Sequence, residues 1–226
     1  MSLAYAGWRG RVQCAIGLVL VALALLAPSV SAQTAVAKAT VAKPQHTILV
    51  MGDSLSAAYG LSAAQGWVAL TSERIVKTKP GWRVVNASIS GETTAGGVSR
   101  IAAELKRTRP AVVVIELGAN DGLRGLPLAQ TRANLERMIK RSQAAGARVL
   151  LVGMRMPPNL GRDYTQGFER NFNELSKLHK TAFLPFLLEP IATDRANFQA
   201  DNLHPVASAQ PKLRDHVWKS LAPLLE

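Results

Sequence analysis

The sequence has one cysteine in 226 residues, few aromatic side chains (5%) and fewer acidic than basic ones. A single cysteine, Cys14, excludes a disulfide framework and a thiolate metal cluster. Charged residues make up 19% and hydrophobic residues 48% of the chain, which excludes collagen, low-complexity disorder and a polytopic membrane protein. These limits leave a globular domain large enough to bury a core without covalent crosslinks.

The first 32 residues have the order of a secretory signal peptide. Arg9 and Arg11 precede an uncharged apolar run, Cys14–Ala27, which is shorter than the roughly 20 residues that a membrane-spanning helix needs. Small residues follow at Val30–Ala32, at the usual cleavage offsets. We therefore expect cleavage after Ala32 and a periplasmic or secreted protein. A retained N-terminal anchor is the alternative.

The mature chain is predicted to begin with a flexible leader, residues 33–45, which is rich in Ala, Lys and Thr and has no periodic burial. The folded domain is expected to span residues 46–226, without an internal repeat or a second domain.

The formal charge of +12 does not by itself indicate a nucleic-acid partner. The densest basic cluster, Lys106–Arg109, ends a predicted helix, where cations complement the helix dipole. No aromatic side chains interleave with it as stacking platforms, so we expect no nucleic-acid partner. A solvated basic surface is the simpler interpretation, and transient contact with an anionic membrane surface is the functional alternative.

Short β-rich runs alternate with longer amphipathic ones along the domain. The predicted strands are His46–Met51, Trp82–Ala87, Ala111–Leu117, Arg148–Met154 and Thr181–Leu187. The predicted helices are Gly66–Lys79, Thr94–Arg107, Leu128–Ala145, Asp163–Lys180 and Val206–Leu225, and Gly146 is placed to end the third. Five such units predict a three-layer α/β/α sandwich with a five-stranded parallel, flavodoxin-like sheet.

In this architecture a ligand site gathers on the loops after the carboxyl ends of the strands. The first loop contains Ser54, expected at the turn into a helix, where backbone N–H groups favour the negative charge that follows nucleophilic attack. An ordinary N-capping serine gives the same pattern.

Two further loops supply candidate hydrogen-bond donors. Gly91 has no side chain and can bring its backbone N–H close to a substrate. Asn120 follows a predicted buried strand and can point its amide into the cleft, as an oxyanion hole requires. The simpler alternative for both is a plain turn, since Asn-Asp-Gly is strong turn chemistry.

The last loop places Asp201 three residues before His204, which can supply a general base and a carboxylate to orient it. The other histidines, His46, His179 and His216, have no such setting. No pair of His, Asp or Glu has the spacing of a metal site, so neither a metal nor a cofactor is expected.

These loops together resemble the SGNH/GDSL hydrolases, whose name-giving residues correspond to Ser54, Gly91, Asn120 and His204. The stretches GDSLSAAYGL, VVNASISGETT, ELGANDGLRG, GRDYTQGF and DNLHP are most similar to the thioesterase I/protease I/lysophospholipase L1, or arylesterase, type. The similarity runs from about Ile48 to the C-terminus.

The resemblance implies a role for each residue. Ser54 corresponds to the nucleophile, His204 to the base and Asp201 to its orienting carboxylate. The backbone N–H groups of Ser54 and Gly91 and the amide of Asn120 correspond to the oxyanion hole. Two acyl-pocket contacts of the family map onto Leu123 and Met156, and Met156 stands where leucine is usual. Asn202 replaces a glycine in the loop before the histidine.

The expected function is that of an exported serine esterase acting on carboxylic esters and thioesters, among them aryl esters, acyl-CoA and lysophospholipids. Small-molecule or lipid acyl esters are the expected partners, and the protein is expected to be a monomer. A carbohydrate acetylesterase is the alternative within the class. A non-catalytic flavodoxin-like binding module is the alternative outside it, but the sequence has no glycine-rich phosphate loop.

Cleavage of the signal peptide predicts that the mature chain begins at Gln33. Mass spectrometry of the exported protein measures this directly. An exported fraction that still carries Met1 would contradict the prediction and favour the retained anchor.

Overall fold

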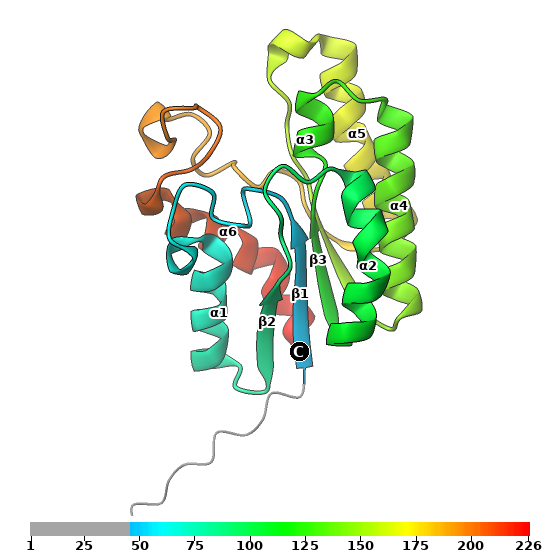
Figure 1. The fold of residues 1–226 in the computed structure, drawn as a ribbon, viewed down its shortest axis with the longest axis vertical. Helices are drawn as coiled ribbons and strands as arrows, with labels where there is room; N and C mark the ends of the chain where they lie inside the picture. The colour runs from blue at the N-terminus through cyan, green and yellow to red at the C-terminus, as the bar shows by residue number, and fades with distance from the viewer. Residues whose placement is uncertain (1–45) are drawn as a thin grey trace, which may run out of the picture. The chain divides into compact units, whose positions relative to one another are not determined.

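The computed structural model describes residues 46–226 (Figure 1). The predicted signal peptide, residues 1–32, and the predicted leader, residues 33–45, lie outside the described residues. Within residues 46–226 no helix combines the length and the apolar character needed to cross a membrane.

The centre of the domain is a five-stranded parallel sheet, as the sequence predicts. Its strands are β1 (His46–Gly52), β2 (Trp82–Asn86), β3 (Val112–Glu116), β4 (Arg148–Val152) and β5 (Ala182–Leu184). They pair in the order β2-β1-β3-β4-β5. β1 pairs with β3 from Ile48 opposite Val112 to Gly52 opposite Glu116. Both strands are buried almost throughout because helices cover both faces of the sheet.

Six α-helices complete the three layers: α1 (Trp67–Thr78), α2 (Thr94–Thr108), α3 (Ala119–Leu123), α4 (Leu128–Ala144), α5 (Arg162–Leu178) and α6 (Gln210–Leu221). Figure 1 shows α1 and α6 on one side of the sheet and α2, α4 and α5 on the other. The short α3 follows β3 directly and lies at the carboxyl end of the sheet.

The helices are held by apolar side chains that recur at helical spacing. On α5, Phe168, Phe172 and Leu175 are at most 1% exposed, and the two phenyl rings lie 5.2 Å apart between centroids. α4 ends as predicted, because Gly146 adopts a φ of 82°, a left-handed conformation that glycine tolerates best.

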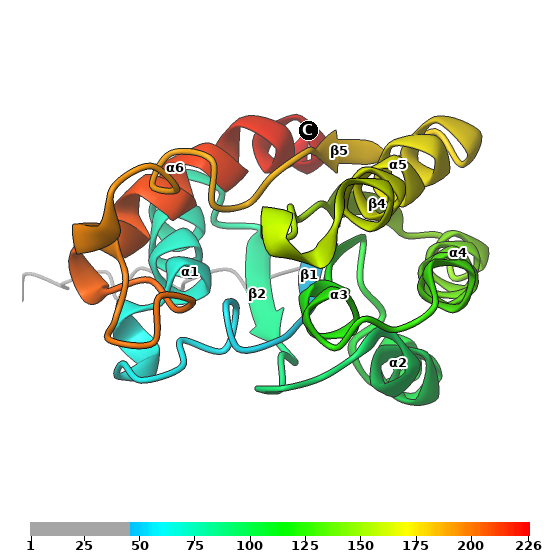
Figure 2. The same ribbon diagram turned by 90° about the horizontal axis from the view of Figure 1, so that it is seen from above.

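The strand order places the topological switch point between β1 and β3, because the chain continues from β1 to β2 on one side and later builds β4 and β5 on the other. Loops that leave neighbouring strands in opposite directions open a crevice at this point. Viewed from above, in Figure 2, the segments after β1, β3 and β4 and the loop before α6 all reach this end of the sheet.

Two sequence expectations at this edge are wrong. Ser54 does not stand at the turn into a helix, because residues 54–60 form consecutive turns and α1 begins at Trp67, one residue after the predicted start at Gly66. Ala119–Leu123 forms the helix α3 where a loop was expected. The reason is a long-range contact: the buried Asp121 carboxylate accepts both the backbone N–H and the hydroxyl of Thr94, which removes Asp121 from the local turn.

The last strand is shorter than predicted. β5 ends at Leu184 because the next residue, Pro185, has no N–H to donate to a sheet ladder. The final predicted helix is observed as α6 flanked by two 3₁₀ turns, Ala207–Ala209 and Ala222–Leu225.

Gly153, which follows β4, is predicted to tolerate no larger residue. A Cβ at this position would lie 2.4 Å from the carbonyl oxygen of Pro185, and the Gly153 N–H donates to the Leu184 carbonyl at 2.7 Å, so the backbone has no room to move. Gly153→Ala should lower the free energy of unfolding in urea by about 1–3 kcal/mol. The control is Gly81→Ala, whose Cβ would meet no atom within 4 Å. Equal effects of the two substitutions would contradict the prediction.

Candidate active site

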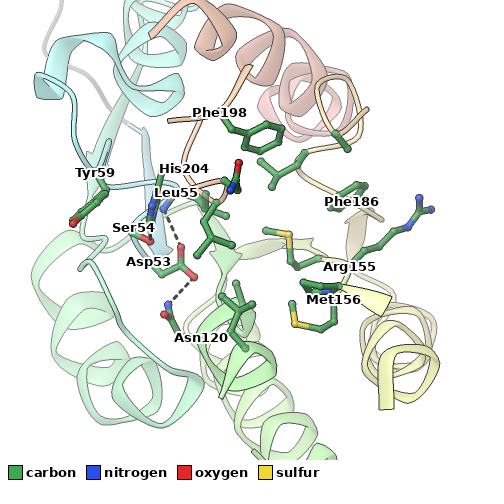
Figure 3. Close-up of a pocket in the computed structure, with 18 of the residues that line it drawn as sticks. Asp53, Ser54, Leu55, Tyr59, Asn120, Arg155, Met156, Phe186, Phe198 and His204 are labelled. Carbon is green, nitrogen blue, oxygen red and sulfur yellow. Dashed lines mark hydrogen bonds between the residues drawn. The ribbon is translucent and has the colours of Figure 1, made fainter. Parts of the chain in front are cut away.

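Three side chains from two distant loops form a continuous hydrogen-bonded chain, and Figure 3 labels two of them, Ser54 and His204. The Oγ of Ser54 lies 2.8 Å from Nε2 of His204, and Nδ1 of His204 lies 2.7 Å from Oδ2 of Asp201. Ser54 follows β1, whereas Asp201 and His204 lie on the loop before α6. The fold thus brings together residues that are 150 positions apart in the sequence.

The surroundings of Asp201 keep its carboxylate ionised. The backbone N–H groups of His204 and Leu203 donate to Oδ1, at 3.0 and 2.9 Å, and the His204 ring contacts Oδ2. These hydrogen bonds lower the pKa of Asp201 to about 2. An ionised carboxylate can only accept, so Nδ1 of His204 carries the proton. Nε2 is then the acceptor that faces the Ser54 hydroxyl.

The loop that carries these two residues is closed by local backbone structure. Phe198 and Pro205 form an isolated antiparallel bridge, and Asn202 at the tip has a φ of 61°. Asparagine is one of the few residues other than glycine that adopt this left-handed conformation readily. Asn202 therefore fits the turn that holds Asp201 and His204 three residues apart.

The predicted oxyanion-hole residues border the same cleft as Ser54. Among residues 46–226, the backbone N–H groups of Ser54 and Gly91 donate to no other residue. Gly91 has a φ of 78°, and its carbonyl oxygen accepts from the guanidinium of Arg124 at 3.1 Å. Both N–H groups are thus available to a substrate oxygen.

The amide of Asn120 is engaged at rest. Its Nδ2 donates to the Glu92 carbonyl at 3.0 Å and to Oδ2 of Asp53 at 3.2 Å (Figure 3). An oxyanion would therefore have to share one of these hydrogens.

A cavity of about 580 Å³ adjoins Ser54 and His204, within the range typical of small-ligand sites. Both predicted acyl contacts line it: Met156 is buried, and Leu123 is 41% exposed at the rim. Figure 3 shows Met156 and Phe186 on the side of the cavity away from Ser54. The wall is mainly apolar, so it suits a hydrocarbon group extending away from the serine.

Several lining residues are absent from the sequence-based site. Those that extend the apolar wall are Leu55, Met154, Phe186, Leu188 and Phe198. They lie on segments with no chemical signature, and only the fold indicates that their side chains meet. Two charged residues could have been selected from the sequence as part of the site. Asp53 directly precedes the candidate nucleophile, and Glu116 is the one ionisable residue of the otherwise apolar strand β3.

Asp53, the residue before Ser54, and Glu116, at the end of β3, form a buried carboxyl pair in which the Asp53 backbone N–H donates to Oε2 of Glu116 at 3.4 Å. Ser56 donates its hydroxyl to Oε2 of Glu116 at 2.6 Å, and the Leu55 N–H donates to Oδ1 of Asp53 at 3.0 Å. Burial raises the pKa of Asp53 to about 6. Burial, and then the charge of Asp53, raise the pKa of Glu116 well above its ordinary value.

The sequence predicts no metal ion in this site. Among the described residues, no group of three or more His, Cys, Asp or Glu side chains could hold a metal ion. The chemistry available in the cleft is that of a serine, an imidazole, a carboxylate and N–H donors.

A doubly wound sheet with a Ser–His–Asp chain beside an apolar cavity at its switch point defines the class of serine hydrolases. The model of the GDSL-like lipase/acylhydrolase family matches residues 50–210. The chain therefore belongs to that family and is an esterase of the SGNH type.

Individual relatives agree with this assignment. Esterase TesA of Pseudomonas aeruginosa is 49% identical over 80% of this chain and 90% of its own length. Thioesterase 1/protease 1/lysophospholipase L1 of Escherichia coli is 41% identical over 79% of this chain and 85% of its own. The crystal structure of the psychrotrophic esterase EstA from Pseudoalteromonas sp., inhibited by monoethylphosphonate, superposes with a TM-score of 0.76. It is 41% identical and covers 80% of this chain and 98% of that one.

The buried carboxyl pair predicts a stability that depends on pH. Because the pKa of Asp53 is about 6 in the folded protein and near 3.8 otherwise, the folded state keeps a proton that the unfolded chain releases. The free energy of unfolding therefore decreases as the pH rises from 4 to 6. Asp53→Asn should gain on the order of 2 kcal/mol relative to wild type between pH 4.5 and pH 8. Urea unfolding at both values measures this. A difference between variant and wild type that is the same at the two values would contradict the prediction.

Proposed function

We propose that this protein is an exported serine esterase that hydrolyses carboxylic esters and thioesters through an acyl-enzyme intermediate. The observation that carries the proposal is the Ser54–His204–Asp201 chain, with contacts of 2.8 and 2.7 Å, at the edge of an apolar cavity. The serine, the base and the orienting carboxylate stand in the order that nucleophilic acyl transfer requires.

In the first half of the reaction, the Oγ of Ser54 attacks the substrate carbonyl carbon while Nε2 of His204 takes its proton. The negative charge that develops on the carbonyl oxygen is stabilised by the N–H groups of Ser54 and Gly91 and by one hydrogen of the Asn120 amide. Collapse of this tetrahedral species expels the alcohol or thiol, which takes the proton from His204. The acyl group remains on Ser54.

In the second half, water occupies the position of the leaving group. His204 accepts a proton from it as it attacks the acyl carbon, and the same three donors hold the second oxyanion. Breakdown releases the carboxylic acid and returns the proton to Ser54 Oγ. Asp201, ionised throughout, keeps the imidazole in the required tautomer and offsets its transient positive charge.

The cavity supports acyl esters with a hydrocarbon chain as the substrate class. Its apolar wall includes Leu123 and Met156, and its volume of about 580 Å³ exceeds what an acetyl group fills. This favours lysophospholipids, aryl esters and acyl thioesters over acetylated carbohydrates. For an exported enzyme lysophospholipids and other exogenous esters are the more natural substrates, because acyl-CoA is cytoplasmic.

The location and the partners form part of the proposal. The signal-peptide pattern of residues 1–32 supports a periplasmic or secreted enzyme. We expect it to act as a monomer. Without Arg9 and Arg11 of the predicted signal peptide, 25 basic and 15 acidic residues remain, and this excess supports transient contact with anionic membrane surfaces, where lysophospholipids occur.

The proposal predicts graded losses for two variants. Ser54→Ala should lower kcat for p-nitrophenyl esters by about 10⁴ or more and abolish labelling by a fluorophosphonate probe. Asn120→Ala removes one oxyanion donor, so it should lower kcat by ~10²–10³ with little change in KM and still allow slow labelling. Steady-state kinetics and a thermal melt of each variant provide the measurements.

The outcomes separate the alternatives. A Ser54→Ala variant with more than about a tenth of wild-type activity would place the nucleophile elsewhere, and a wild-type protein that resists the probe would favour a binding module. If Asn120→Ala lowers the melting temperature and spares kcat, Asn120 serves only to shape α3. A panel of acyl lengths that includes lysophosphatidylcholine and palmitoyl-CoA tests the substrate class, and a preference for acetyl esters would favour the acetylesterase.

A further inference from the structure

An aromatic ring covers the imidazole that faces Ser54. The ring of Tyr59 lies with its centroid 4.4 Å from that of His204, tilted by 38°. Tyr59 is half exposed at the edge of the cavity. In Figure 3 it lies on the side of His204 away from Met156. A centroid separation of 4.4 Å with a tilt of 38° is that of two rings whose faces overlap, so Tyr59 meets a face of the imidazole, while its two nitrogens contact Ser54 and Asp201.

The backbone that presents Tyr59 is held in an unfavourable conformation. The preceding residue, Ala58, is buried with a φ of 60°, a region that residues with a Cβ occupy rarely. Its Cβ packs where Gly66 has no side chain, since a Cβ on Gly66 would lie 2.7 Å from it. Such strain persists only where neighbouring contacts fix it, and it concentrates at functional sites.

A single glutamine joins the Tyr59 segment to the His204 loop. Nε2 of Gln199 donates to the carbonyl oxygen of Tyr59 at 2.9 Å and also contacts that of Pro205 at 3.2 Å. The backbone N–H of Gln199 donates to the His204 carbonyl at 2.8 Å. The loop after β1 and the loop before α6 are thereby fastened to each other directly beside the reacting groups.

We propose that Tyr59 and Gln199 form a clasp that holds the His204 imidazole in line with Ser54. Both are positioning residues, and the inference rests on the proposed function of the triad. Gln199 sets the distance between the two loops, and the Tyr59 ring restricts rotation of the imidazole. The π-face of Tyr59 also favours the positive charge that His204 acquires when it takes the serine proton.

The clasp gives the strained backbone at Ala58 a role. The chain must turn sharply after Ser54 for residue 59 to return over His204, and the Tyr59 N–H donates to the Ser54 carbonyl at 3.1 Å to close this turn. A relaxed backbone at Ala58 would direct the ring elsewhere. The catalytic serine and the ring that covers its base are thus fixed by one short loop.

Four variants test the clasp. Tyr59→Leu supplies an apolar side chain without a ring. Tyr59→Phe keeps the ring and removes only the hydroxyl. Gln199→Met removes the side-chain donor. Its matched control is Gln143→Met, because Nε2 of Gln143 also donates to a backbone carbonyl, that of His179 at 2.8 Å, at the opposite end of the sheet.

We expect Tyr59→Leu and Gln199→Met to lower kcat for p-nitrophenyl acetate about tenfold, with melting temperatures near that of wild type. Tyr59→Phe and Gln143→Met should stay within about twofold of wild type. The second readout is the proton NMR signal of the His204 Nδ1–H. It should be sharp in wild type and Tyr59→Phe and broadened by exchange with water in Tyr59→Leu.

Wild-type kcat and a sharp Nδ1–H signal in both Tyr59→Leu and Gln199→Met would overturn the clasp. Equal losses in Tyr59→Phe and Tyr59→Leu would show that the ring is not responsible, and equal losses in the two glutamine variants would show that the effect is not local. Failure of the proposed function would give a different result. Ser54→Ala would then remain active in the same assay, independently of the activities of the Tyr59 and Gln199 variants.

Discussion

The pairing of β1 with β3 is the constraint on which the active site depends. These two strands share a register from Ile48–Val112 to Gly52–Glu116, and each carries a reactive segment at its carboxyl end. Ser54 and Asn120 therefore enter the same crevice although 66 positions separate them. The chain leaves β1 toward β2 and leaves β3 toward β4, so the two loops diverge and leave space for a substrate between them. A change in register would misplace the serine relative to the amide and would also turn core side chains outward.

The site contains carboxylates in two opposite electrostatic environments. Asp201 is partly exposed and receives backbone hydrogen bonds that lower its pKa to about 2, so it is a permanent acceptor for the imidazole. Asp53 and Glu116 are buried, and burial raises the pKa of each. One environment keeps the charge on the carboxylate that contacts His204, and the other holds buried titratable groups next to the candidate nucleophile in the chain and at the end of β3. Because Asp53 also accepts from the Asn120 amide, this buried pair is linked to the proposed oxyanion hole as well as to stability.

The sequence predicts the chemistry of the site better than its surroundings. Ser54, Asp201 and His204 could be chosen because each residue type has a defined reactivity and each stands on a loop after, or before, a recognisable element. The apolar wall could not be chosen in this way, since Met154, Phe186 and Phe198 resemble any other core residues until the chain folds. The short helix α3 was missed because local preferences favour a turn at Asn-Asp-Gly, whereas the carboxylate of Asp121 is used by Thr94, 27 positions away.

What the sequence by itself determined is the alternation of strands and helices, the parallel sheet, and the candidate residues for a nucleophile, a base and oxyanion donors. These follow from periodicity, turn chemistry and the resemblance to a family, all of which are local or linear properties. Only the tertiary structure decided that the segment after Ser54 is a series of turns with a strained Ala58, that Tyr59 covers His204, and that Gln199 joins their loops. The physical reason is that these contacts connect segments some 140 residues apart, and their geometry depends on how the sheet positions both loops at once.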